Sequence, residues 1–210
     1  EAVRGGAGQV SIGVNIEIVW AHGGKNRASS RMSILRPDNA TMPATPLIPP
    51  NGFDSLQFRS ALGMFATGVT IVTARGPDGS LVGLTANSFN SVSLSPPLVL
   101  WSLAQRAGSM PVFSRGSHYA INILAAEQQD LARRFATRDI DRFAGVAWRE
   151  GAGGAPVLDG AAAVFECANR SQYQEGDHVI FVGEVECCSA REGALPLIFH
   201  GGRYYTELPL

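Results

Sequence analysis

GLTANSFNSVSLSPPLVLWSL, residues 83 to 103, is the stretch that decides the fold. It begins with small hydroxyl and amide side chains and ends in the apolar run 97–103, which predicts a buried strand. Pro96 and Pro97 fix the entry of the chain into that strand. Neutral hydroxyls and exposed backbone N–H groups can bind a phosphate or the edge of a heterocycle. An ordinary turn rich in Ser and Asn, between two strands, accounts for the same composition.

The chain on both sides of this stretch predicts a mainly β protein. A helix is expected to start at Asp54, with Gln57 completing a capping-box pattern, and to end at Gly68. Strands are expected at 69–73, 81–86, 97–103, 119–124, 162–168, 178–187 and 203–207. A second helix is expected at 127–137, with Leu131 and Phe135 on one face. Many short strands and few helices favour an antiparallel barrel.

Composition limits the partners of the protein. Charged residues make up 17% of the 210 positions and hydrophobic residues 45%, with a formal net charge of -1. Low charge suggests that a partner subunit covers some surface, and it gives no electrostatic case for nucleic acid or an acidic membrane. We find no apolar run near 18 residues and no signal-peptide pattern, so we expect no membrane span and a cytoplasmic location. The three Cys and four His show no ligand spacing, so no metal site is expected.

The first part of the chain differs from the rest. All ten Phe lie at position 53 or later, and residues 21–50 are rich in Gly, Ser, Asn and Pro. Residues 1–52 are therefore interpreted as an N-terminal extension, as a linker or disordered arm, or as an arm that packs on a partner subunit. Residues 53–210 are expected to form the folded domain.

Several common catalytic motifs are missing. The sequence has no GxSxG elbow, and Pro156 stands where a GxGxxG motif starting at Gly151 would need its last glycine. Lys25 is the only lysine and has no P-loop around it. An enzyme of this composition needs little acid–base machinery of its own. Hydride transfer by a bound cofactor fits, because the cofactor carries the chemistry and the protein positions it.

Five segments in order resemble the flavin reductase family, the small NAD(P)H:flavin oxidoreductases that serve two-component flavin-dependent monooxygenases. They are FATGVTIVT (65–73), the stretch 83–104, HYAINIL (118–124), LARRFATRDIDRF (131–143) and YQEGDHVIFVGEV (173–185). The resemblance covers about residues 56–207. It implies an FMN-binding split barrel, antiparallel and Greek-key-like with a few flanking helices, and a homodimer with two flavin sites near the subunit interface.

The resemblance also implies which residues contact the flavin. They are Thr67, Gly68 and Val69; Thr85, Ala86, Asn87 and Ser88; Ser91, Val92 and Ser93; Ser102, Leu103 and Ala104; and, towards the phosphate, Ser109 and Phe113. Trp101, within the same stretch, is expected in the core.

His178 lies in Gly176-Asp177-His178, and the matching histidine of the family lies where the nicotinamide binds. We therefore expect His178 to position the nicotinamide, with Asp177 orienting it or capping the turn; a strand-end histidine bonded to backbone is the alternative. Arg203 and Tyr204, on the last strand, could reach the flavin or the dinucleotide.

Two further groups of side chains, three cysteines and four arginines, have simple structural interpretations. Cys167, Cys187 and Cys188 are expected to be small core residues. A basic stripe near the second helix is either a solvated face or a site for dinucleotide phosphate, and it comprises Arg133, Arg134, Arg138 and Arg142.

The function implied is reduction of FAD (or FMN) by NADH (or, less favoured, NADPH), with reduced flavin passing to a separate monooxygenase. Two alternatives stay open on the same fold: a flavin-binding module without catalysis, and a reductase of ferric or other metal chelates. The sequence leaves the choice of flavin, the choice of reductant and the identity of the oxygenase open.

Overall fold

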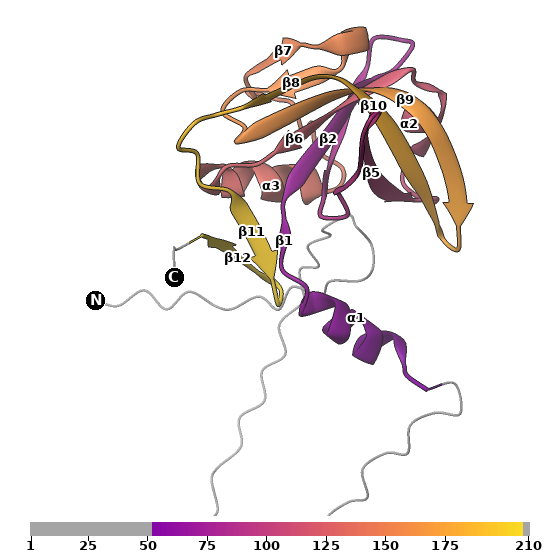
Figure 1. The fold of residues 1–210 in the computed structure, drawn as a ribbon, viewed down its shortest axis with the longest axis vertical. Helices are drawn as coiled ribbons and strands as arrows, with labels where there is room; N and C mark the ends of the chain where they lie inside the picture. The colour runs from indigo at the N-terminus through magenta and orange to yellow at the C-terminus, as the bar shows by residue number, and fades with distance from the viewer. Residues whose placement is uncertain (1–51, 208–210) are drawn as a thin grey trace, which may run out of the picture.

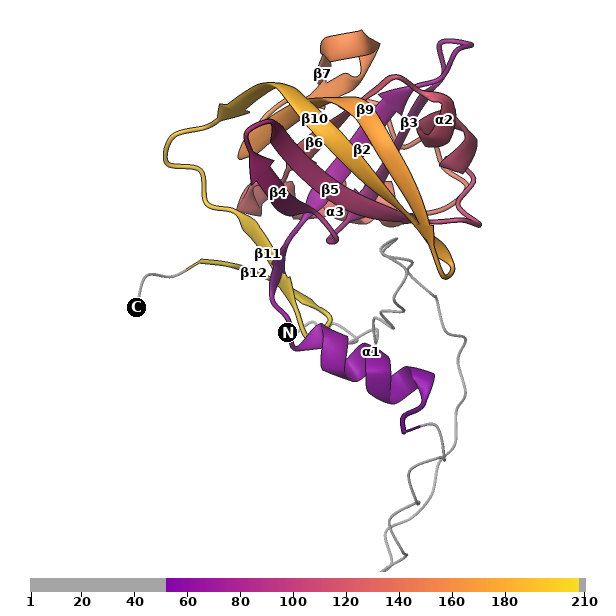
Figure 2. The same cartoon turned by 45° about the vertical axis from the view of Figure 1, so that its right-hand side comes forward.

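The computed structural model describes residues 52–207. The expectation of an N-terminal extension therefore falls almost wholly outside the described residues. Where the structure describes the chain, the architecture is a curled antiparallel sheet with two small sheets and three α-helices around it (Figures 1 and 2).

The first helix, α1 (Ser55–Gly63), begins as predicted but ends earlier. Asp54 accepts a hydrogen bond from the Gln57 amide and Gln57 accepts one from the Asp54 amide, so the predicted capping box is confirmed. The prediction of an end at Gly68 was wrong. The amide of Met64 already caps the helix, and β1 (Thr67–Gly68) is extended. The prediction rested on apolar residues at helical spacing up to Phe65. None of the residues of α1 is buried, and Phe65 is 73% exposed.

The main sheet has seven strands, all paired antiparallel with their neighbours. In spatial order they are β3 (Leu81–Ala86), β2 (Thr70–Arg75), β6 (His118–Ile123), β9 (Ala163–Glu175), β10 (His178–Ala190), β5 (Pro97–Ala104) and β4 (Asn90–Leu94). Figure 2 shows β4 and β5 in front of β2 and β6, so the sheet curls on itself into a barrel. The predicted mainly β, antiparallel barrel is confirmed.

Aromatic rings fill the barrel. Trp101 stacks on Phe181 with ring centroids 4.8 Å apart, and Phe113 and Tyr119 meet the same indole edge-on at 4.9 and 5.7 Å. All four side chains are at most 1% exposed. The expectation that Trp101 lies in the core is confirmed, and such contacts add about 0.5–1.5 kcal/mol per pair beyond area burial.

The second predicted helix is divided into a 3-10 turn, η1 (Ala126–Gln128), and α3 (Gln129–Ala136). Phe135 from α3 is fully buried and meets Phe143 edge-on at 5.0 Å, while Leu131 packs at the margin of the same cluster. In Figure 1, α3 lies below the barrel, on the side facing β11 and β12.

The remaining elements lie at the two ends of the barrel. β1 pairs with β11 (Leu197–His200), which pairs with β12 (Arg203–Thr206). At the other end, β7 (Trp148–Glu150) pairs with β8 (Pro156–Leu158) around η2 (Ala152–Gly154). A short helix, α2 (Met110–Arg115), follows β5.

The structure corrects the prediction for two of the three cysteines. Cys167 is buried on β9, but Cys187 and Cys188 are exposed. Both belong to the last part of β10, where five consecutive residues from Glu186 to Ala190 are exposed. Strand-like sequence indicated the strand correctly, but it did not show that this end of the strand lacks covering side chains.

Two observations concern residues 52–207 alone. No helix there is long and apolar enough to cross a membrane. That part of the chain also holds no group of three or more His, Cys, Asp or Glu side chains that could bind a metal ion.

Candidate functional site

Three of the predicted flavin-binding segments lie side by side at one end of the barrel. The end of β3 is held to β2 by pairing of Ala86 with Thr70. The next turn is held to β5 by Ser88, whose hydroxyl accepts a 2.9 Å hydrogen bond from the Ser102 amide. The end of β5 pairs with the start of β10, where Ala104 lies opposite His178. The structure therefore brings residues 85–88, residues 102–104 and His178 into one continuous row.

Seven of the predicted contacts are buried, among them Ala104 at 3% and His178 at 7% exposed. The other five are buried so deeply that a ligand could meet them only through their main chain. They are Val69, Thr85, Ala86, Leu103 and Phe113, each at most 1% exposed. The Thr85 hydroxyl is already used, because it donates a 2.6 Å hydrogen bond to the carbonyl oxygen of Ala132 in α3. Neighbouring strand residues point to opposite faces of the sheet, so Ala86 lies in the barrel core while Thr85 faces α3, and both faces of β3 are covered.

The middle of the deciding stretch forms a strand, β4, rather than the turn that its composition suggested. Ser91, Val92 and Ser93 lie on this strand at the sheet edge, and Val92 is 48% exposed. A β-bulge between Ser91 and Ser93 interrupts the pairing with β5. Asn87 is half-buried in the turn that leads into β4.

Four predicted site residues have buried polar atoms without a hydrogen-bond partner: Thr67 Oγ1, Ser109 Oγ, His178 Nε2 and the Tyr204 hydroxyl. Leaving a buried donor or acceptor unpaired costs about 1–3 kcal/mol. Such atoms are rare in folded proteins, and a ligand that pairs with them removes the penalty. This set suits a flavin and a nicotinamide nucleotide, which offer ring nitrogens, carbonyls, hydroxyls and phosphates as partners.

His178 is the best-positioned titratable side chain of the site. Its Nδ1 lies 2.6 Å from Asp177 Oδ1, while its Nε2 is buried and unpaired. The hydrogen bond to His178 is the main cause that holds the pKa of the Asp177 carboxyl below its ordinary value. In this geometry Asp177 holds one ring nitrogen of His178, and the other ring nitrogen makes no hydrogen bond within the protein.

The turn that carries His178 is fastened to β5 by Gln105. The Gln105 amide donates to the Asp177 carbonyl at 2.9 Å, and its side-chain nitrogen donates to the Gly176 carbonyl at 2.9 Å. Gly176 has a φ of +59°, a left-handed conformation that favours glycine. Gln105 was not predicted, and a polar side chain one residue after a buried strand was the only signal for it.

Arg203 and Tyr204 lie on β12, away from the row that ends at His178. Tyr204 pairs with Phe199, which pairs with Thr67 on the other side, so the two unpaired hydroxyls of Thr67 and Tyr204 flank one strand. Burial raises the pKa of Tyr204 to about 12, so its hydroxyl stays protonated at neutral pH. The Arg203 side chain is exposed.

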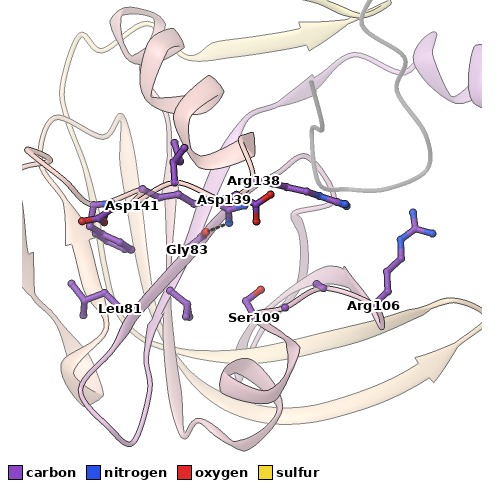
Figure 3. A pocket seen from close by; sticks show the side chains of 13 residues that line it. Leu81, Gly83, Arg106, Ser109, Arg138, Asp139 and Asp141 are labelled. Carbon is purple, nitrogen blue, oxygen red and sulfur yellow. Dashed lines mark hydrogen bonds between the residues drawn. The ribbon is translucent and has the colours of Figure 1, made fainter. Parts of the chain in front are cut away.

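A pocket of about 550 Å³ opens beside Ser109 (Figure 3). Three segments line it: the start of β3, the turn after β5 and the loop after α3, comprising residues 81–83, 106–109 and 138–143. Of the predicted flavin contacts it contains Ser109, and of the basic stripe it contains Arg138 and Arg142. Arg142 holds the loop against β3 by donating to the carbonyl oxygens of Gly83 at 2.6 Å and Thr137 at 2.9 Å.

Comparison with known proteins identifies the family. Residues 62–207 match the model of the flavin reductase like domain. The chain is 47% identical over 163 residues to "FMN reductase (NADH) SmoA" of Agrobacterium fabrum, covering 78% of this chain and 92% of that protein.

A second relative is longer. The reductase component of the flavin-dependent trigonelline monooxygenase of Acinetobacter baylyi is 43% identical over 150 residues, which cover 71% of this chain and 48% of that protein. This chain thus spans about half of that relative.

A solved structure agrees with both. The NADH:FAD oxidoreductase SgcE6 of Streptomyces globisporus, in complex with NAD and FAD fragments, superposes with a TM-score of 0.72 at 40% identity over 79% of this chain and 98% of that one. The row of strand ends, the unpaired polar atoms and the matches all lead to one conclusion: the chain belongs to the flavin reductase family.

Proposed function

We propose that the protein uses NADH to reduce FAD or FMN and releases the reduced flavin to a separate flavin-dependent monooxygenase. The observation that carries the proposal is the row of residues 85–88, 102–104 and His178, whose buried Nε2 has no partner within the protein. The names of relatives agree, since they include an NADH-dependent FMN reductase and reductase components of monooxygenases.

The protein's own part in this reaction is binding and orientation. When bound, a flavin supplies the chemistry by taking up a hydride from reduced nicotinamide. The main chain of residues 85–88 and 102–104 would hold the ring system, and Ser109 the phosphate. His178, with Nδ1 fixed by Asp177, would hold the nicotinamide through Nε2. Residues 85–88 and 102–104 are all uncharged, which suits a flavin that must leave after each turnover.

The test measures oxidation of the reduced nicotinamide nucleotide by absorbance. NADH and NADPH are each paired with FAD and with FMN. Saturable oxidation that requires added flavin supports the proposal, and we expect NADH to be the better reductant. His178→Ala should lower kcat/KM for NADH about ten- to hundredfold, because a misplaced substrate loses that much. Tight flavin binding without NADH oxidation would instead indicate a binding module. Faster reduction of a ferric chelate than of flavin would indicate a chelate reductase.

A homodimer is part of the proposal. No residue of α1 is buried, and Leu56, Met64 and Phe65 in and after it are more than 70% exposed. In Figures 1 and 2, α1 stands clear of the barrel beyond β1, β11 and β12. A helix of nine residues is marginal without packing. A second copy that covers α1 supplies the missing packing and explains the exposed apolar surface.

The cytoplasm is the proposed compartment. Cys187 and Cys188 are exposed free thiols, which persist where the surroundings are reducing. Immunolocalisation or fractionation of the native host would test this.

A further inference from the structure

Two threonine hydroxyls hold the end of β3 from opposite faces of the sheet. Thr70, the first residue of β2, donates a 2.8 Å hydrogen bond to the carbonyl oxygen of Ala86, the last residue of β3. Thr85 faces the other way and donates to the Ala132 carbonyl of α3 at 2.6 Å. Both threonines are buried. The strand end is therefore bonded to β2 on the barrel side and to α3 on the outer side.

The bond from Thr70 also sets the direction of the next amide. The peptide between Ala86 and Asn87 is trans, so its C=O and N–H groups point in opposite directions. Because the carbonyl is held towards β2, the Asn87 amide is directed away from β2. β3 is the last strand of the seven-stranded order on this side. The Gly83 carbonyl points to the same open edge, where it accepts from Arg142.

The main-chain group that this geometry directs outward is not used by the fold. Within residues 52–207 the Asn87 amide makes no hydrogen bond, whereas the hydroxyls around it are bonded to the main chain. Ser88 follows the same pattern, since its hydroxyl accepts from the Ser102 amide. The hydroxyls of Thr70, Thr85 and Ser88 therefore fix the row from within, and they leave main-chain groups for a ligand.

From these contacts we infer that Thr70 and Thr85 are positioning residues for flavin binding. Their hydroxyls fix the main chain at the end of β3, and this main chain, not either side chain, meets the flavin. A strand end that is already ordered loses less conformational freedom on binding, so it binds the ring system more tightly. The inference rests on the proposed function, in which residues 85–88 hold that ring system.

Replacement of threonine by valine tests the inference. Thr70→Val and Thr85→Val each exchange a hydroxyl for a methyl group of similar size, so each removes one hydrogen bond. Thr73→Val is the matched control. Thr73 is fully buried on β2, and its hydroxyl donates to the Pro156 carbonyl of β8, away from the end of β3. Thermal melting should show that all three variants are folded and that each is less stable than the wild type.

The first readout is the Kd of oxidised flavin, measured by fluorescence titration with FMN and with FAD in the absence of reductant. We expect Thr70→Val and Thr85→Val each to weaken binding about three- to tenfold. The factor should be the same for FMN and FAD, because both carry the ring system. Thr73→Val should match the wild type. Thr70→Ser and Thr85→Ser keep the hydroxyl and should recover most of the affinity.

Steady-state kinetics provide the second readout. In Thr70→Val and Thr85→Val the KM for flavin should rise by about the factor seen in the titration, while the KM for NADH stays unchanged. A general loss of stability would not separate the two substrates in this way.

Three outcomes overturn the inference: wild-type flavin affinity in both valine variants, equal weakening in Thr73→Val, or serine variants as weak as the valine variants. If a valine variant melts below the assay temperature, alanine at the same position repeats the comparison. The titration contains no reductant, so it is independent of turnover. A wild type that binds flavin but oxidises neither NADH nor NADPH would overturn the proposed function, and the Kd values would still decide the roles of Thr70 and Thr85.

Discussion

His178 reaches its position through its neighbours. Asp177 fixes one ring nitrogen, and Gln105 fixes the turn from which both residues project. Each contact is local, but together they align the start of β10 with the end of β5. The orientation of the histidine therefore also depends on a side chain from the turn after β5.

Gln105→Met removes the side-chain donor to Gly176 while keeping the length of the side chain. Losing one hydrogen bond of about 0.5–1.5 kcal/mol predicts a rise in KM for NADH of about two- to tenfold, with the flavin Kd unchanged. Gln172→Met is the matched control. Gln172 lies on β9, and its side chain donates a 3.0 Å hydrogen bond to the Ser114 carbonyl. Equal kinetic effects in the two variants would contradict a positioning role for Gln105.

At the scale of elements, β3 and α3 pack so closely that one position requires glycine. A Cβ on Gly83 would lie 2.6 Å from Cε1 of Phe135. Gly83→Ala should lower the free energy of unfolding by about 1–3 kcal/mol, as overpacking does. Adding Phe135→Leu should recover part of that loss, so urea denaturation of the double variant should show less than the sum of the single effects. Strict additivity would show that the two residues do not collide.

The flap formed by β7, η2 and β8 is tied to β9 by Glu166. Arg149 and the Ala152 amide each donate to its carboxylate at 2.7 Å. Burial alone would raise the pKa of Glu166, but these hydrogen bonds outweigh it and hold the pKa below the ordinary value of 4.5.

The pH dependence of stability follows from the direction of this shift. A carboxyl whose pKa is lower in the folded chain binds a proton more readily when unfolded, so its contribution is complete above pH 4.5 and is lost as the pH falls through the folded-state pKa. The urea midpoint should be flat at neutral pH and fall in acid, with a shallower fall in Glu166→Gln. Glu184→Gln, which breaks an exposed pair with Arg170, is the control and should keep the wild-type profile. An unchanged profile in Glu166→Gln would contradict the argument.

Sequence pattern predicted most elements and missed those without a local signal. β3, β5 and β6 are apolar runs bounded by turn residues, and they were found nearly to the residue. β4 was missed because Asn90–Leu94 is polar and its strand conformation comes from pairing with β5. β11 is four residues long and is a strand because β1 and β12 flank it.

At the scale of the whole molecule, the predicted dimer depends on the apolar surface around α1. Phe65→Glu places a charge on this surface at a side chain that is 73% exposed, so the fold of one copy should tolerate it. We expect light scattering to give a dimeric mass for the wild type and a shift towards monomer for Phe65→Glu, because an unpaired charge in an interface is strongly unfavourable. Ala190→Glu should leave the mass unchanged. A monomeric wild type would exclude the dimer.

The site was predictable in part at this scale. Motif order indicated the row of strand ends and His178, which the structure brings together through strand register. The pocket was not predicted as a unit, because residues 81–83, 106–109 and 138–143 meet only after the barrel has formed. No single one of these segments is distinctive in sequence.

Because the three cysteines differ in burial, the rates at which they react with a thiol reagent can report unfolding. Burial is the main reason that the pKa of the Cys167 thiol rises to about 12, so in the native protein this group is both shielded and protonated. A thiol reagent should therefore modify Cys187 and Cys188 at once and Cys167 only when β9 separates from its neighbours. Mass spectrometry of the third addition over time would report the opening rate of the barrel without any engineered label.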